Sequence, residues 1–135
     1  MEFAGMNYLA VGLAALAAFV FGAVYYGALS RAWMKAAGLT PEQAAFTPTL
    51  FVTTAVSLLV MAYVLAGVIG HLGDGRVTVR NGVISGGLVW LGFIITAMLV
   101  NHRYQGARWD LTLIDGAHWL IVALLMGAVI GFMGV

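Results

Sequence analysis

Two ionisable residues, Asp115 and His118, stand three positions apart inside an apolar stretch near the end of the sequence. On a helix, side chains at this spacing share a face, so the carboxylate and the imidazole can share a hydrogen bond. Ionisable groups inside a membrane span are costly, and they usually face a bundle interior or a water-filled cavity. The pair is therefore the first candidate for a site that holds a proton, a cation or a small polar ligand.

A purely structural role for the same pair is the alternative. If the span begins near Leu111, Asp115 lies about 6 Å and His118 about 10 Å along the helix axis, close to the lipid headgroups. An aspartate in the first turn interacts favourably with the helix dipole. Arg103 or Arg108, on the preceding connection, is placed to neutralise it. A polar clamp between helices and a ligand site both stay open.

Other polar residues are expected at the same face of the membrane. Tyr25 and Tyr26 end the first apolar stretch and Asn101 ends the third, so they are candidates to join the site. The alternative is an aromatic and basic belt of the kind that anchors helices at a membrane interface. The interfacial anchors that we predict are Arg31, Trp33, Lys35, Arg103, Arg108 and Trp109.

Four apolar stretches must position these residues. With 63% apolar and only 8% charged residues, a soluble domain of 135 residues would aggregate. A hydrocarbon core of about 30 Å is crossed by ~20 apolar residues of helix. We predict an all-α polytopic membrane protein, a single domain over 1–135 with transmembrane helices at about 7–29, 48–70, 82–101 and 111–134 in a compact bundle.

The connections between spans carry their own signals. In the first, residues 31–37 predict a short interfacial helix that Gly38 ends. Thr40, Pro41 and Gln43 have the N-cap, N1 and N3 identities of a second short helix.

The second connection has a Gly73-Asp74-Gly75 turn followed by alternation at 77–79. This pattern predicts a small extended or hairpin excursion. No chemistry is evident in it.

Small residues recur four apart in every span, which permits close approach of helix backbones. These stripes are expected to build the bundle, and a spare face is available for a homo-oligomer or a partner membrane protein. The helix-packing residues that we predict are Gly22, Ala66, Gly70, Gly82, Gly86, Gly127 and Gly131.

Several classes of protein are disfavoured by the composition. The formal net charge of +1 gives no basic field for nucleic acid. Without cysteine there is no thiolate metal site or thiol nucleophile. A haem has no second well-placed intramembrane histidine to bind it, and no serine occupies a nucleophile elbow. We expect no nucleic-acid partner, no metal, no cofactor and no enzymatic activity.

Several short motifs carry a resemblance to a known family. They are Met6-Asn7-Tyr8-Leu9-Ala10-Val11, Ala32-Trp33-Met34-Lys35, Gly38-Leu39, Trp90-Leu91-Gly92-Phe93, Val100-Asn101, Ile114-Asp115-Gly116 and Met126-Gly127-Ala128. Over nearly its whole length the chain resembles an uncharacterised bacterial family of four-helix integral membrane proteins, domain of unknown function 1761. Ala117-His118-Trp119 departs from a family pattern that is more tyrosine-histidine-like. The resemblance implies four helices and no activity, and it implies Met6 as the customary start, with 1–5 as an extension.

Loop charges predict the orientation. Four lysines and arginines in the first and third connections oppose two in the second, so both termini are predicted outside the cytoplasm. With a bacterial family, the inner membrane is the expected location. Two function classes remain: a small protein, expected to be oligomeric, that binds or transports a proton, cation or small polar ligand at the polar site, and an accessory subunit that packs against a larger membrane complex.

Overall fold

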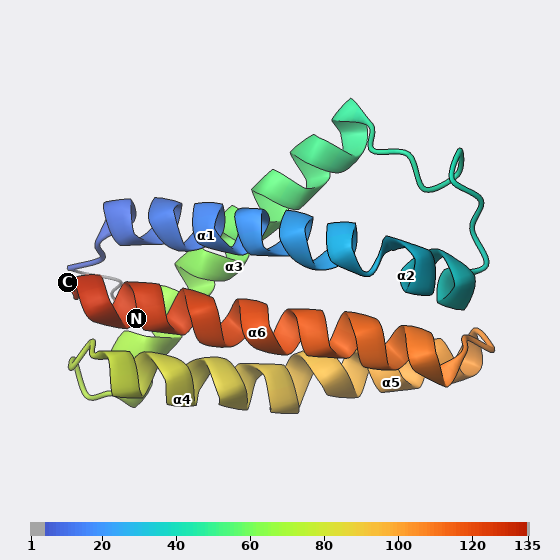
Figure 1. Cartoon of the computed structure of the whole chain (residues 1–135). Coiled ribbons are helices and arrows are strands. Elements are labelled where there is room, and N and C mark those ends of the chain that lie inside the picture. The colour runs from blue at the N-terminus through green and yellow to red at the C-terminus, as the bar shows by residue number, and fades with distance from the viewer. Residues whose placement is uncertain (1–4, 135) are drawn as a thin grey trace.

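The computed structural model describes residues 5–134, which form helices and no strand (Figure 1). Four long helices are apolar enough to cross a membrane, and a short helix lies between the first two. This confirms the predicted all-α fold. The elements are α1 (Tyr8–Ala28), α2 (Ser30–Ala37), α3 (Pro48–Leu72), α4 (Val79–Val89), the π-helical turn η1 (Trp90–Ile94), α5 (Ile95–Tyr104) and α6 (Trp109–Met133).

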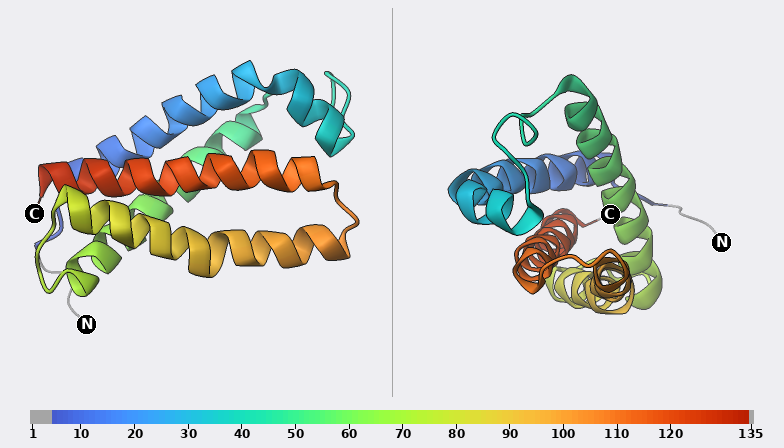
Figure 2. Two further views of the ribbon diagram at one scale, coloured as in Figure 1. Left: turned by 60° about the horizontal axis from the view of Figure 1, so that its bottom comes forward. Right: turned by 90° about the vertical axis from the view of Figure 1, so that its right-hand side faces the viewer.

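The spans alternate in direction through the bundle. The segment α4-η1-α5 is one continuous span, Val79–Tyr104, and it lies along α6 on the side opposite α1 (Figures 1 and 2). α1 begins and α6 ends at the same end of the bundle, where the connection between α3 and α4 also lies. α3 crosses the other helices steeply, and its N-terminal end stands away from them (Figure 2).

Side-chain N-caps fix the first residues of α1, α3 and α4. Asn7, Thr47 and Thr78 each accept a hydrogen bond from the backbone N–H three residues further on, at 3.0, 3.2 and 3.2 Å. Such caps satisfy donors that a helix start leaves without a partner. At Gly38 the chain takes a φ of 69°, which ends α2 as predicted.

Two expectations for the connections were met only in part. Thr78 is extended, but no hairpin forms at 77–79, because Thr78 caps α4 and the third span starts at Val79 rather than at 82. Thr40 and Gln43 do exchange the two hydrogen bonds of a capping box, at 2.9 and 3.3 Å, but they close only a turn. The helix cannot continue from there because Thr47 precedes a proline and is held extended.

The closest helix contact joins α4 to α6. A β-carbon built on Gly82 would fall on the carbonyl group of Gly127, and one built on Gly86 would fall on that of Ala123. A β-carbon on Gly131 would meet the Thr78 carbonyl in the same way. Only glycine permits backbones to approach this closely, which is how small residues hold helices together in lipid.

The remaining predicted packing residues lie in different surroundings. Ala66 is partly buried against the apolar core formed by α1, α3 and α6. Gly22 faces α6, where a β-carbon would come within 3.1 Å of the imidazole Nε2 of His118. Gly70 takes no part in a close contact, because a β-carbon there would meet nothing within 4 Å.

Candidate functional site

Two tyrosines at the end of α1 hold the beginning of α6. The Tyr26 hydroxyl donates a 2.7 Å hydrogen bond to Oδ1 of Asp115. The Tyr25 hydroxyl donates to the backbone carbonyl of Ile114, also at 2.7 Å. The two bonds bring together three residues of the predicted site, Tyr25, Tyr26 and Asp115, and they attach α1 to α6 at one end of the bundle.

His118 lies one turn further along α6 and is only 6% exposed. Its ring is surrounded by aromatic rings at centroid distances of 4.7 Å (Trp119), 4.8 Å (Tyr26), 5.6 Å (Tyr25) and 5.9 Å (Phe21). Within residues 5–134, its Nδ1 has no hydrogen-bond partner. A buried ring nitrogen is thus left unpaired inside a membrane-spanning helix.

The hydrogen bond that the spacing of Asp115 and His118 suggests is not formed in the described part of the chain. The Asp115 carboxylate accepts its hydrogen bond from Tyr26 instead, and the imidazole Nδ1 stays without one. The reason is geometric: the end of α1 lies beside the beginning of α6, so a hydroxyl from the neighbouring helix reaches the carboxylate.

The short helix α2 adds Trp33 to the same cluster. The Trp33 ring packs edge-on against Tyr26 at 5.8 Å, and its indole approaches the Asp115 carboxyl group. Arg31 and Lys35 on the same helix are exposed. α2 therefore presents its tryptophan to the site and its charges to the surroundings, as an amphipathic interfacial helix does.

The site lies deeper in the bundle than the sequence suggested. α6 begins at Trp109, two residues before the predicted start. At 1.5 Å per residue, Asp115 is about 9 Å and His118 about 14 Å along the axis from that first residue. His118 is then nearly half of a ~30 Å hydrocarbon core away from the helix start.

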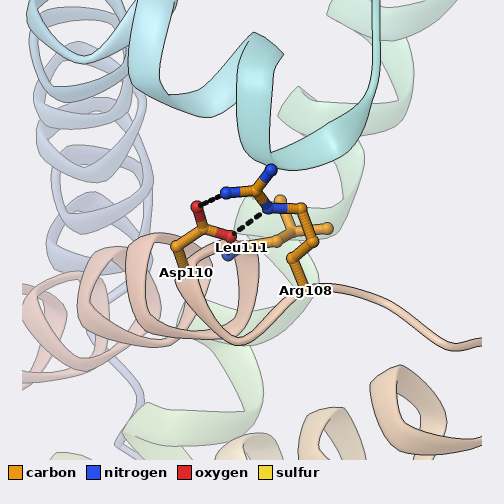
Figure 3. Close-up of polar contacts among 3 residues, drawn as sticks. All are labelled: Arg108, Asp110 and Leu111. Atoms are coloured by element: carbon orange, nitrogen blue, oxygen red, sulfur yellow. Dashed lines mark hydrogen bonds and ion pairs between the residues drawn. The ribbon is translucent and has the colours of Figure 1, made fainter.

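Neither arginine of the third connection neutralises Asp115, contrary to expectation. Arg108 instead forms a two-pronged pair with Asp110, at 3.0 and 2.7 Å, and Asp110 also accepts the Leu111 N–H at 3.0 Å (Figure 3). The hydrogen bond to Asp110 raises the pKa of Arg108 above its ordinary value. This pair stabilises the first turn of α6, where a carboxylate suits the helix dipole.

Arg103 belongs to a second polar cluster, between α5 and α6. Its guanidinium donates to the Thr112 hydroxyl at 2.7 Å and lies 3.6 Å from the centre of the Trp109 ring. His102 Nδ1 also lies 2.7 Å from the Thr112 hydroxyl. Asn101, the remaining predicted site residue, is exposed. No three histidine, aspartate or glutamate side chains within 5–134 gather closely enough to hold a metal ion.

Sequence reasoning missed several residues that make these clusters. Phe21 precedes Tyr25 by four positions, so helical spacing was a usable signal for Phe21, whereas Trp119 follows His118 directly, a spacing that predicts no shared face. Thr112 and Trp90 gave no such signal. The Trp90 indole donates a 2.9 Å hydrogen bond to the Gly116 carbonyl, which joins the third span to α6.

Four helices that are long and apolar enough to cross a membrane indicate a multi-pass integral membrane protein. The chain belongs to the DUF1761 family, described as a protein of unknown function, and the match extends over residues 9–131. This confirms the family resemblance in the sequence. No curated protein and no solved structure matches the chain.

Proposed function

We propose that this protein binds a proton within the membrane at the cluster of Asp115, Tyr26 and His118, as a non-catalytic binding protein. The observation that carries the proposal is the His118 imidazole, which is buried and has an unpaired Nδ1. Leaving a buried polar atom without a partner costs about 1–3 kcal/mol. An apolar residue would fill the same space without that cost, so the imidazole is retained at a loss of stability.

The surroundings of His118 suit a group that changes its charge. The centroids of four aromatic rings lie within the ~6 Å over which a ring attracts a cation, and the ring of Phe21 is stacked with the imidazole. The Asp115 carboxylate, one turn away, also favours a positive imidazolium, whereas burial disfavours it. These opposing influences support a histidine that accepts and releases a proton.

A route for the proton leads to His118 from the end of the bundle where α6 begins. Asp115 is half-buried, and the Tyr26 hydroxyl links it to the region of the imidazole, because the Tyr26 ring lies 4.8 Å from that of His118. Beyond His118, the buried apolar side chains of Val122, Met126 and Ile130 fill α6's inner face. In this conformation a proton can therefore reach the site from one side only. Transport across the membrane would require α6 and the helices packed against it to move.

The charge of the connections assigns a side to this site. Arg31, Lys35, Arg103 and Arg108 lie at the end of the bundle where α6 begins, and two arginines lie at the other end. Cytoplasmic loops carry the excess of lysine and arginine. The proposal therefore has the site open toward the cytoplasm from a bacterial inner membrane, with both termini on the far side.

Nuclear magnetic resonance of the full chain in lipid nanodiscs, with ¹⁵N-labelled histidine, tests the proposal. His118 is assigned by the signal lost in His118→Leu, and the exposed His71 is the internal reference. The expected result is a protonation step at His118 between pH 4 and 9 whose midpoint moves in Asp115→Asn. An imidazole that keeps one state over this range, in both the parent and Asp115→Asn, would refute a proton site.

A vesicle assay then separates binding from transport. The protein is reconstituted with a pH-sensitive dye inside, and an imposed pH gradient is followed over time. If the protein only binds a proton, the pH gradient decays as slowly as it does in empty vesicles. If the protein transports protons, the gradient decays faster with the unmodified protein than with Asp115→Asn.

A second candidate function, an accessory subunit, draws support from α3. The N-terminal end of this helix stands away from the bundle and exposes Leu50, Phe51, Val52 and Val56 (Figure 2). Purification in mild detergent, followed by mass spectrometry, discriminates the two. A different membrane protein at equal stoichiometry supports the subunit role, whereas a chain that purifies alone or only with itself counts against it.

A further inference from the structure

An apolar groove of about 350 Å³ lies between the third span and α6. Its volume is within the range of small-molecule sites, about 300–1,000 Å³. One wall contains Trp90, Ile95 and Leu99, and the other runs along α6 from Trp109 to Leu120. The eleven residue-to-residue steps from Trp109 to Leu120 rise about 17 Å along the helix, so the groove extends from the start of α6 deep into the apolar region.

The groove arises where the third span departs from regular α-helix. Up to Gly86, the α4 backbone lies directly on that of α6. The π-helical turn Trp90–Ile94 follows, and beyond it bulky side chains separate the helices: a β-carbon on Gly116 would come within 2.8 Å of Ile95 Cδ1. A π-turn changes the direction of the side chains after it, and it often marks a functional site. The change from glycine contact to side-chain contact leaves space open to lipid.

The end of the groove nearest the membrane surface carries a positive charge. Trp109 and Thr112 both line the groove, and both contact the Arg103 guanidinium. Within residues 5–134, no carboxylate pairs with Arg103, since the ion pair found there joins Arg108 to Asp110. The buried Nε of Arg103 also has no acceptor in this part of the chain. The guanidinium donates to the Ala107 carbonyl and the Thr112 hydroxyl, which are both neutral, so its charge is not neutralised. An apolar groove that ends at this charge is complementary to an anionic lipid.

We propose that this groove binds a phospholipid with an anionic headgroup, whose acyl chain lies between Trp90 and Leu120 and whose phosphate contacts Arg103. The site is separate from the proton site, because it lies on the opposite side of α6. Basic pockets between transmembrane helices bind anionic headgroups by the same combination of charge and apolar contact.

Quenching of tryptophan fluorescence by brominated acyl chains tests the proposal. The full chain carrying Trp33→Phe and Trp119→Phe keeps only the two groove tryptophans, Trp90 and Trp109. It is placed in phosphatidylcholine vesicles that contain equal small fractions of brominated phosphatidylglycerol or brominated phosphatidylcholine. The expected preference for the anionic lipid is about fivefold, the size associated with one cation at a membrane surface.

Matched variants locate the charge responsible. The preference is expected to vanish in Arg103→Gln and to survive in Arg103→Lys. It is also expected to survive in Arg108→Gln, because Asp110 already pairs with Arg108. Equal quenching by both lipids in the parent overturns the proposal. So does weak quenching by both together with a cross-linked dimer, because a second copy of the chain would then fill the groove.

Discussion

The Tyr26 hydroxyl and the Asp115 carboxylate, 89 positions apart in the sequence, meet in a 2.7 Å hydrogen bond between α1 and α6. The contact lies one helical turn before the buried His118, and the Tyr26 ring is itself packed against that imidazole. A single tyrosine therefore contacts both ionisable residues of the site, which do not bond directly to each other.

A double-mutant cycle with Tyr26→Phe and Asp115→Ala measures this contact. Hydrogen bonds between membrane helices are worth about 0.6 kcal/mol on average and at most about 1.7 kcal/mol, so the coupling energy should lie in this range. Unfolding by SDS in bicelles gives the four free energies. Additive losses would show that the hydroxyl and the carboxylate do not interact in lipid.

His118→Leu should leave the free energy of unfolding unchanged or raise it by about 1 kcal/mol, because it removes a buried nitrogen that has no partner. The same bicelle measurement checks this, with His102→Leu as the comparison. His102 Nδ1 has a partner in Thr112, so its replacement should destabilise the protein. Destabilisation by His118→Leu of more than 2 kcal/mol would instead assign the imidazole a packing role.

Gly82→Ala should destabilise the bundle by about 2–3 kcal/mol, because its β-carbon would fall on the Gly127 carbonyl and push α4 from α6. Gly70→Ala is the matched control. It adds the same methyl group where nothing lies within 4 Å, and it improves helix propensity, so its effect should be neutral or slightly stabilising. Similar losses in both variants would argue against the close α4-α6 contact.

Thr112→Val should cost about 1–3 kcal/mol, because it removes the hydroxyl that Arg103 and His102 both contact. Thr112→Ser keeps the hydroxyl and should retain most of the stability. Thr96→Val is a further control, since the exposed Thr96 bonds only to its own helix and should change stability by less than about 0.5 kcal/mol. If both valine variants behave alike, the cluster at Thr112 is not a stabilising one.

The sequence predicted the spans, and the presence of the polar pair within the fourth span, because these depend on local properties. Long apolar stretches identify membrane helices, and an aspartate and a histidine stand out within one. The end of α2 at Gly38 and the start of α3 after Thr47 were likewise predictable, because a glycine C-cap and a threonine N-cap act on the adjacent backbone. The partners of Asp115 and the arginines were not predictable, since they depend on which helix ends lie side by side.

The π-helical turn changes which residues of α5 face α6. Turns of 3.6 residues counted from Gly86 bring about positions 100 and 104 to the face toward α6. The structure leaves Val100 and Tyr104 exposed, at 56% and 91%, and buries Met98 and His102 in part instead. The π-turn therefore changes which residues of α5 face α6. The motif Trp90-Leu91-Gly92-Phe93 gives no sequence signal of a π-turn.

Adjacent residues of α6 make contacts on opposite sides of that helix. Asp115 accepts from Tyr26 of α1, and the Gly116 carbonyl accepts from Trp90 of the third span. Rotation of α6 about its own axis is therefore restrained from both sides, since a turn that lengthens one bond also displaces the other. Loss of the bond to Asp115 would therefore remove the restraint on the α1 side and leave the Trp90 bond alone to oppose rotation of α6.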